Sequence, residues 1–216
     1  MGASCCEGKN PELEKLARDQ RKVLWIVLAI NLIMFGVEVT SGIYADSVAL
    51  LGDSLDMLGD AFAYGASLYV VGLGLVAKAR SAMFKGWIIL LSSVAVIAAA
   101  LYRVFLQEVP ASGVMGIIGG LALLANLTCL FLLTRFRNAD VNMASVWLCS
   151  RNDIIANVSV LCAAGLVSIT GSSWPDLAVG GLLAIIFARS AFHIFSESRR
   201  SLDSAGVDRE NEVSCQ

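Results

Sequence analysis

The chain has 216 residues, of which 57% are hydrophobic and 16% are charged, and its formal net charge is −2. Because a soluble domain has about 25% charged residues, this composition is that of a polytopic membrane protein. The nearly balanced charge argues against nucleic acid as a partner.

Residues 1–22 are predicted to form a polar, cytoplasmic N-terminal segment. The segment has no apolar stretch before Val23, so it does not read as a signal peptide. Asn10 and Pro11 indicate the cap and the first turn of a helix, which leads into a first apolar span at about residues 23–44. The segment also holds Cys5 and Cys6. Two interpretations of these adjacent thiols stay open, metal capture for delivery and no metal role.

Five more apolar spans are predicted, at about residues 47–77, 84–106, 113–133, 142–170 and 177–195. Each is long enough to cross a hydrocarbon core of about 30 Å as a helix. Nearly all Lys and Arg residues lie in the N-terminal segment, in the second and fourth connections and in the C-terminal tail; Arg103, near a helix end, is expected to snorkel. By the positive-inside rule, both termini face the cytoplasm. We therefore expect an all-α protein, with a six-helix transmembrane domain at 23–198 and a short cytoplasmic tail at 199–216.

The second span carries three carboxylates, Asp53, Asp56 and Asp60, at positions i, i+3 and i+7. In a helix this spacing places all three on one face. An acid in the middle of a membrane span costs about 2.5–3.5 kcal/mol, so three acids on one face require a positive partner. We expect this partner to be a divalent metal ion.

Asp153 in the fifth span is expected to lie at the same depth as these acids. Leu58 lies eleven residues into a span that enters from outside, and Asp153 lies eleven residues into one that enters from inside. At 1.5 Å per residue both are about 16 Å deep, near the middle of the hydrocarbon core. Asp56 and Asp60 should therefore meet Asp153, with Cys149 one helical turn below it and Asn157 one turn above.

Oxygen ligands with one sulfur, in a roughly tetrahedral arrangement, suit Zn²⁺ and neighbouring transition metals. Mg²⁺ and Ca²⁺ prefer more oxygens or retained waters. Protons and metal would compete for the same ligands, since protonation of a ligand displaces the metal and metal binding displaces protons. Such competition predicts an exchanger that moves metal one way and protons the other.

Other polar residues within the spans have two interpretations each. Asp53 is nearer the outer face, where it is a ligand or relay or else the wall of a cavity. Asn157, Asn126 and Asn31 either orient a ligand or form a hydrogen bond between helices. Glu38, about 9 Å from the outer end of its helix, is a proton relay or a carboxylate that snorkels to the interface.

Two basic side chains near the spans are not expected to be ligands. Arg151 is two residues from Cys149, so it should face away from the site; its partner stays open. His193, the only histidine, falls at the cytoplasmic end of the sixth span among several arginines. We expect it to be interfacial.

These residues resemble the cation diffusion facilitator family over about residues 23–198. Asp53, Asp56 and Asp60 are similar to that family's second-helix pattern of an Asp, then a His or Asp, then an Asp four residues on. The resemblance makes Asp56 and Asp60 the metal-binding pair. Cys149 and Asp153 resemble the family's His-x-x-x-Asp helix, with a cysteine in place of the histidine. The Trp-Pro-Asp sequence at 174–176 is also similar to the family.

The resemblance implies proton-coupled export of Zn²⁺, or of Co²⁺, Cd²⁺, Fe²⁺ or Mn²⁺, from the cytoplasm across a lipid bilayer. The short tails favour a bacterial cytoplasmic (inner) membrane as its location. The resemblance also implies a homodimer and a protein that is not an enzyme. Two departures from the family pattern matter. Cys149 weakens the fourth ligand or favours thiolate-preferring metals. The cytoplasmic metal-binding domain that usually follows is missing, so the dimer would lack its usual anchor.

The alternative function is that of an intramembrane Mg²⁺-dependent prenyl- or phospho-transferase. The spacing of Asp53, Asp56 and Asp60 also resembles the first aspartate motif of intramembrane prenyltransferases, whose Mg²⁺ ions bind a diphosphate. Those enzymes need a second acid-rich motif, and the fifth span offers only Asp153. The connections also lack a Lys/Arg cluster to bind a diphosphate. A metal-sensing or scaffolding membrane protein is a third class, and metal flux in proteoliposomes separates a transporter from both.

Overall fold

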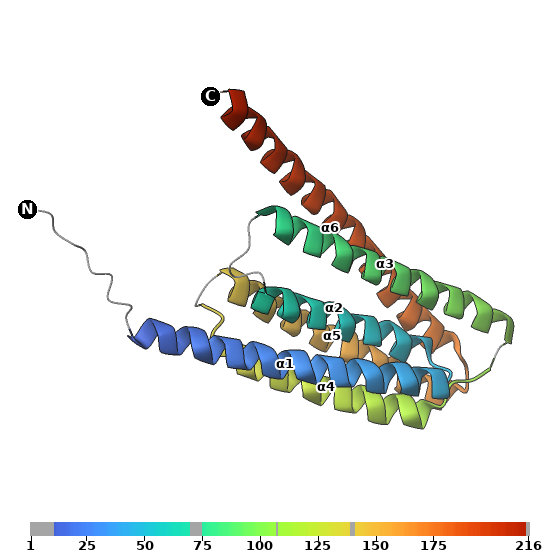
Figure 1. Cartoon of the computed structure of the whole chain (residues 1–216). Coiled ribbons are helices and arrows are strands. Elements are labelled where there is room, and N and C mark those ends of the chain that lie inside the picture. The colour runs from blue at the N-terminus through green and yellow to red at the C-terminus, as the bar shows by residue number, and fades with distance from the viewer. Residues whose placement is uncertain (1–10, 70–74, 107, 139–140, 215–216) are drawn as a thin grey trace, which may run out of the picture.

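The computed structural model describes residues 11–69, 75–106, 108–138 and 141–214, and this part of the chain is all-α, as predicted. It forms six helices (Figure 1). In chain order these are α1 (Pro11–Tyr44), α2 (Val48–Tyr69), α3 (Leu75–Leu106), α4 (Ser112–Thr134), α5 (Val141–Thr170) and α6 (Trp174–Ser214).

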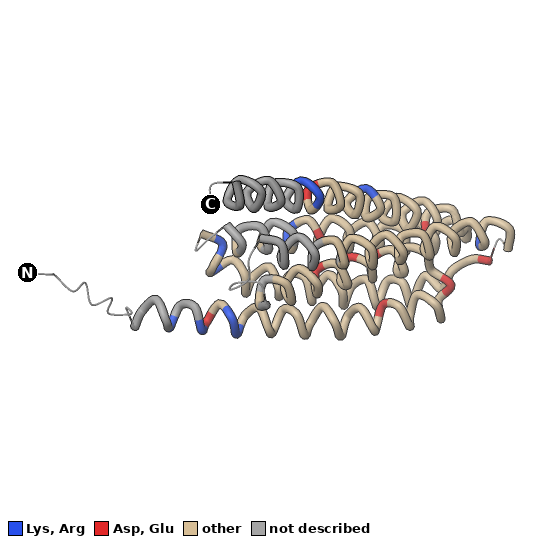
Figure 2. The backbone as a smooth tube through the Cα atoms, turned by 45° about the horizontal axis from the view of Figure 1, so that its top comes forward, with Lys and Arg blue, Asp and Glu red and all other residues tan. Residues whose placement is uncertain are grey.

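Five of the helices, α1, α3, α4, α5 and α6, contain stretches long and apolar enough to cross a membrane. The chain is therefore an integral membrane protein. Helix α2 is not among the five, because Asp53, Asp56 and Asp60 interrupt its apolar sequence. The start of α1 and the end of α6 lie at the same end of the bundle (Figure 1), as an even number of passes requires. Lys and Arg gather toward this end (Figure 2).

Three helix boundaries differ from the prediction. Helix α2 ends at Tyr69 rather than at about residue 77, and residues 75–77 belong to α3. Helix α3 begins at Leu75 rather than at about residue 84, so Lys78, Arg80 and Lys85 lie in the helix and not in a connection. Lys, Arg and Ala are strong helix formers, and basic side chains at a membrane surface do not interrupt a helix. The short polar tail predicted at 199–216 continues α6 as far as Ser214.

Helix α2 is the central element of the bundle. It packs against α1, α3, α5 and α6, while α3 pairs with α6, and α4 pairs with α5 and α1 (Figure 1). The contact with α6 is unusually close at Gly180, where a Cβ atom would lie 2.4 Å from the carbonyl carbon of Val48. Only glycine permits this approach, so a backbone-to-backbone contact fixes α2 against α6.

The first turn of α2 is bound by Asp176 at the start of α6. Asp176 Oδ1 accepts hydrogen bonds from Ser47 Oγ at 2.6 Å and from the Ala49 N–H at 3.0 Å, and its Oδ2 accepts one from the Val48 N–H at 2.7 Å. Ser47 Oγ also accepts a bond from the Leu50 N–H. An acid from another helix thus satisfies amide groups that the start of a helix leaves unpaired. This bond set fixes the depth of the acids farther along α2.

The connection that precedes α2 is held by an ion pair. Arg103 Nη2 lies 2.8 Å from Asp46 Oδ1, so this arginine pairs with a loop acid instead of only snorkelling as predicted. Asp46 has a φ of 55°, a left-handed conformation that Asp tolerates because its short polar side chain bonds locally. At this end of the bundle, the ion pair therefore holds α3 against the connection from α1 to α2.

Candidate metal centre

Three carboxylates from two helices meet inside the bundle. Asp56 and Asp60 of α2 and Asp153 of α5 each offer an oxygen, and these three oxygens lie within 4.8 Å of one another. Asp60 and Asp153 are buried, and Asp56 is partly exposed. Among the described residues, Asp153 Oδ2 has no hydrogen-bond partner. The structure thus brings together the three residues that the depth of the spans placed at one level, and their role as metal ligands stays a prediction.

The electrostatics of this cluster demand compensation. Two unit charges 4.8 Å apart repel by about 3 kcal/mol at an effective dielectric constant of about 20, and three ionised carboxylates make three such pairs. The cluster must therefore hold shared protons or a cation. Oxygens at the corners of a tetrahedron around Zn²⁺, with bonds of about 2.1 Å, are about 3.4 Å apart.

Cys149, the predicted fourth ligand, belongs to α5, but its side chain lies outside the described residues. The Cys5 and Cys6 pair also lies outside them. Both remain predictions from the sequence.

Tyr64 is a site residue that the sequence analysis missed. Its hydroxyl donates a hydrogen bond to Asp60 Oδ2 at 2.6 Å, and its side chain is fully buried. The signal was present in the sequence, because Tyr64 follows Asp60 by four residues and so lies on the same face of α2. Tyr64 therefore fixes the orientation of the Asp60 carboxylate.

Asn157 binds a different acid from the one expected. Its Nδ2 lies 3.0 and 3.2 Å from the two carboxylate oxygens of Asp53, rather than bonding Asp153. Asn126 of α4 donates to Asn157 Oδ1 at 3.4 Å. Both interpretations of the asparagines therefore apply to this pair, because the bonds join α2, α4 and α5 and also hold an acid of the second-helix motif.

Asn31 and Glu38 of α1 are both buried. Asn31 donates to the carbonyl of Val27 at 2.9 Å and to Cys129 Sγ of α4 at 3.7 Å, which makes it a link between helices. Glu38 has an exposure of 0%, so the interpretation as a snorkelling carboxylate is wrong. A side chain can snorkel only where lipid or water lies beside its helix, and α2 and α4 pack against α1.

Arg151 and His193 lie away from the acids, as predicted. The Arg151 guanidinium lies 5.7 Å from the centre of the Trp147 ring, within range of a cation–π contact. His193 is exposed, and its Nε2 lies 3.7 Å from a carboxylate oxygen of Glu197 in the same helix. Neither side chain faces the carboxylate cluster.

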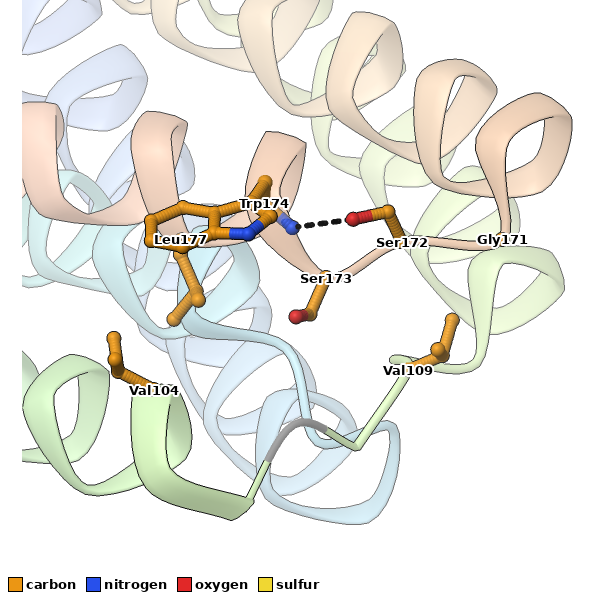
Figure 3. A pocket seen from close by; sticks show the side chains of 7 residues that line it. All are labelled: Val104, Val109, Gly171, Ser172, Ser173, Trp174 and Leu177. Atoms are coloured by element: carbon orange, nitrogen blue, oxygen red, sulfur yellow. Dashed lines mark hydrogen bonds between the residues drawn. The ribbon is translucent and has the colours of Figure 1, made fainter.

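A cavity of about 230 Å³ lies at the end of the bundle where α3 ends and α6 begins. Figure 3 shows the side chains around it, with the N–H of Trp174 donating to Ser172 Oγ. The lining residues are Val104, Val109, Gly171, Ser172, Ser173, Trp174 and Leu177. None of them is an acid, a histidine or a cysteine, so this cavity is not the metal site.

Comparison with known proteins gives a consistent picture. Residues 24–202 match the family model of the cation efflux transmembrane domain. The chain is 24% identical over 177 residues to the metal cation efflux system protein CzcD of Cupriavidus metallidurans, covering 75% of this chain and 55% of that protein. It is 27% identical over 190 residues to a cadmium, cobalt and zinc/H(+)-K(+) antiporter of Bacillus velezensis, covering 80% and 61%. It is 26% identical over 194 residues to the zinc transporter ZitB of Yersinia pestis, covering 84% and 62%. The chain thus spans less than two thirds of the length of each of these relatives.

Proposed function

The chain belongs to the cation efflux family, and from this premise we propose that it exports a divalent transition metal from the cytoplasm in exchange for protons. Zn²⁺ is the first candidate cargo. The relatives named for zinc, cadmium and cobalt support this class of ion. By the same inference the protein acts in a bacterial cytoplasmic membrane, as a homodimer, and is a transporter rather than an enzyme.

The observation that carries this proposal is the meeting of Asp56, Asp60 and Asp153 within 4.8 Å. Three acids from two helices, inside a bundle that crosses a membrane, make a binding site for a cation with more than one positive charge. Carboxylates bind Zn²⁺ and its neighbours when few ligands and a compact geometry are available. Tyr64 supports the site by orienting Asp60 from within the same helix.

Proton exchange follows from the chemistry of these ligands. A carboxylate must lose its proton to bind metal, so metal binding releases protons and acid weakens metal binding. If the site opens alternately to each side, metal bound on the cytoplasmic side is displaced by protons on the other side. This competition couples the two fluxes without any covalent step.

The transferase alternative receives no comparable support. Such an enzyme requires a second cluster of acids for its Mg²⁺ ions, and within the described ranges one group of three candidate ligands comes together, that of Asp56, Asp60 and Asp153. The cation efflux family model also covers the same residues that the transferase motif would use.

The test is metal flux into proteoliposomes that contain the purified chain and a zinc-sensitive dye, with an imposed pH gradient. We expect Zn²⁺ entry to accelerate when the gradient drives protons in the opposite direction. Asp60→Asn and Asp153→Asn should each reduce the flux at least tenfold. Glu108→Gln, which removes an exposed acid in a connection, is the matched control and should leave the flux unchanged. Undiminished flux in either aspartate variant would contradict the proposed site.

A further inference from the structure

Glu38 is a buried acid that the carboxylate cluster does not use. Its side chain is 0% exposed, and among the residues that the structure describes neither carboxylate oxygen has a hydrogen-bond partner. It lies outside the group formed by Asp56, Asp60 and Asp153. An ionised carboxylate with no donor beside it is not stable in apolar surroundings. In the metal-free protein Glu38 therefore carries a proton.

The surroundings of Glu38 contain two other acids, both on α2. Glu38 lies within electrostatic reach of Asp53 and Asp56. The other helix packed against α1 is α4, whose only titratable side chain is Cys129, and this thiol lies beside Asn31, two helical turns farther inward. No Lys, Arg or His therefore stands among the described residues that face Glu38 from either helix.

The neighbouring acid Asp53 is held differently from Glu38. Both of its oxygens face Asn157 Nδ2, at 3.0 and 3.2 Å, and this amide stabilises a carboxylate in its charged form. The two acids thus form an unequal pair, in which Asp53 has a donor and Glu38 has none. Asp53 precedes Asp56 by one helical turn on the same face of α2, and both acids lie within electrostatic reach of Glu38.

We propose that Glu38 and Asp53 form a proton-binding pair that is separate from the metal ligands and carries one of the counter-transported protons. The proposal rests on the proposed function, and it names a second group of residues that couples metal export to proton import. Glu38 lies six residues before the outer end of α1, about 9 Å along the helix, on the path to the outer solution. A proton from that side converts the Glu38 carboxylate to the acid, and the reverse step releases it.

Charge links this pair to the metal site. A divalent cation among Asp56, Asp60 and Asp153 adds two positive charges one helical turn from Asp53, and this favours the ionised form of Glu38. Departure of the metal favours its protonation again. Metal and proton thus exclude each other here through electrostatic repulsion, although they occupy different atoms. Asp53 contributes to this coupling, because it lies one helical turn from Asp56 and within electrostatic reach of Glu38.

The experiment measures proton release when Zn²⁺ binds to the purified full chain in weakly buffered detergent solution, together with the Zn²⁺ dissociation constant. Glu38→Gln keeps the shape of the side chain, and Glu38→Leu removes its polarity. In both variants we expect Zn²⁺ binding to persist with one proton fewer released per metal ion. When the two Glu38 variants are reconstituted in proteoliposomes, their Zn²⁺ flux should depend less on the pH gradient than the wild-type flux does. Thr40→Val is the control, because Thr40 is exposed at a similar depth on α1 and its hydroxyl donates to the carbonyls of Gly36 and Val37 within the same helix.

Each result decides the question. An unchanged proton count in a folded Glu38 variant would overturn the proposal. If only one of the two Glu38 variants folds, the proton count of that variant decides. If neither variant folds, Glu38 is needed for the structure itself, and the proposal is also overturned. Failure of the proposed function is distinguishable, because wild-type protein would then bind no Zn²⁺ or release no protons.

Discussion

Asn157 of α5 donates its side-chain amide to the carboxylate of Asp53 in α2, with nitrogen–oxygen distances of 3.0 and 3.2 Å. This contact connects the two helices that supply Asp56, Asp60 and Asp153. Asn126 adds α4 to the same set of hydrogen bonds. The relative position of the three candidate metal ligands therefore depends on an amide that is not itself a ligand.

Asn157→Leu tests this dependence. The substitution removes the donor from Asp53 and the acceptor from Asn126, and it leaves a buried carboxylate without its amide. We expect Zn²⁺ affinity to fall about 10- to 100-fold, as is usual when a residue that supports metal ligands is lost. Competition with a chromogenic chelator measures it. Asn152→Leu, on the exposed side of the same helix, should leave the affinity unchanged. An equal affinity in both variants would show that Asn157 does not position the site.

Asp176→Asn should destabilise the bundle although it changes none of the three candidate metal ligands. The variant keeps the size of the side chain but loses a charge that accepts three hydrogen bonds at the start of α2. We expect the free energy of unfolding to fall by about 1.5–3 kcal/mol, as for hydrogen bonds to a charged group. Asp46→Asn is the comparison, since its ion pair with Arg103 is partly exposed. Such a pair contributes about 0–1 kcal/mol, and Asn tolerates the left-handed conformation. Thermal unfolding in detergent should rank the two variants in this order; the reverse order contradicts the role of Asp176.

Gly180→Ala and Gly181→Ala are adjacent substitutions with opposite expectations. A Cβ at Gly180 meets the backbone of Val48 at 2.4–2.5 Å, whereas a Cβ at Gly181 meets nothing within 4 Å. Because backbone cannot rotate out of the way, Gly180→Ala must separate α2 from α6. We expect it to cost about 1–3 kcal/mol of stability, as other overpacked positions do. Thermal unfolding of both variants, with Zn²⁺ binding as a second readout, measures the difference. Equal stability would show that the helices tolerate a wider spacing.

The sequence predicted those features that depend on one helix at a time. Apolar length and the positions of Lys and Arg identified the spans, because the bilayer fixes the length of a crossing helix. The spacing of Asp53, Asp56 and Asp60 identified a polar face, because the helical repeat is regular. The level of Asp153 followed from counting residues into two spans. These quantities are local or are set by the thickness of the membrane.

Features that depend on the rotation of one helix against another could not be predicted. Depth placed Asn157 beside Asp153, but the rotation of α5 against α2 brings it to Asp53. Depth also placed Glu38 near the interface, but contacts with α2 and α4 bury it. Helix α3 begins at Leu75 rather than at about residue 84, because the basic residues before the predicted start favour a helix. The contact of Asp176 with α2 crosses more than 120 residues of sequence, and no local pattern encodes such a partner.

Cys149→His tests the choice of metal. In α5, Cys149 precedes Asp153 by four residues, and this spacing places the two positions on one face of the helix. A thiolate is a soft ligand that favours Cd²⁺ over Zn²⁺ more strongly than an imidazole does. We therefore expect Cys149→His to bind Zn²⁺ and to lower the ratio of Cd²⁺ to Zn²⁺ affinity, measured by competition between the two ions on the purified protein. Cys162→Ser, at an exposed cysteine of the same helix, is the control and should leave the ratio unchanged. If Cys149→His also leaves the ratio unchanged, Cys149 does not contact the metal, and the three carboxylates must bind it with water or with another side chain as the fourth ligand.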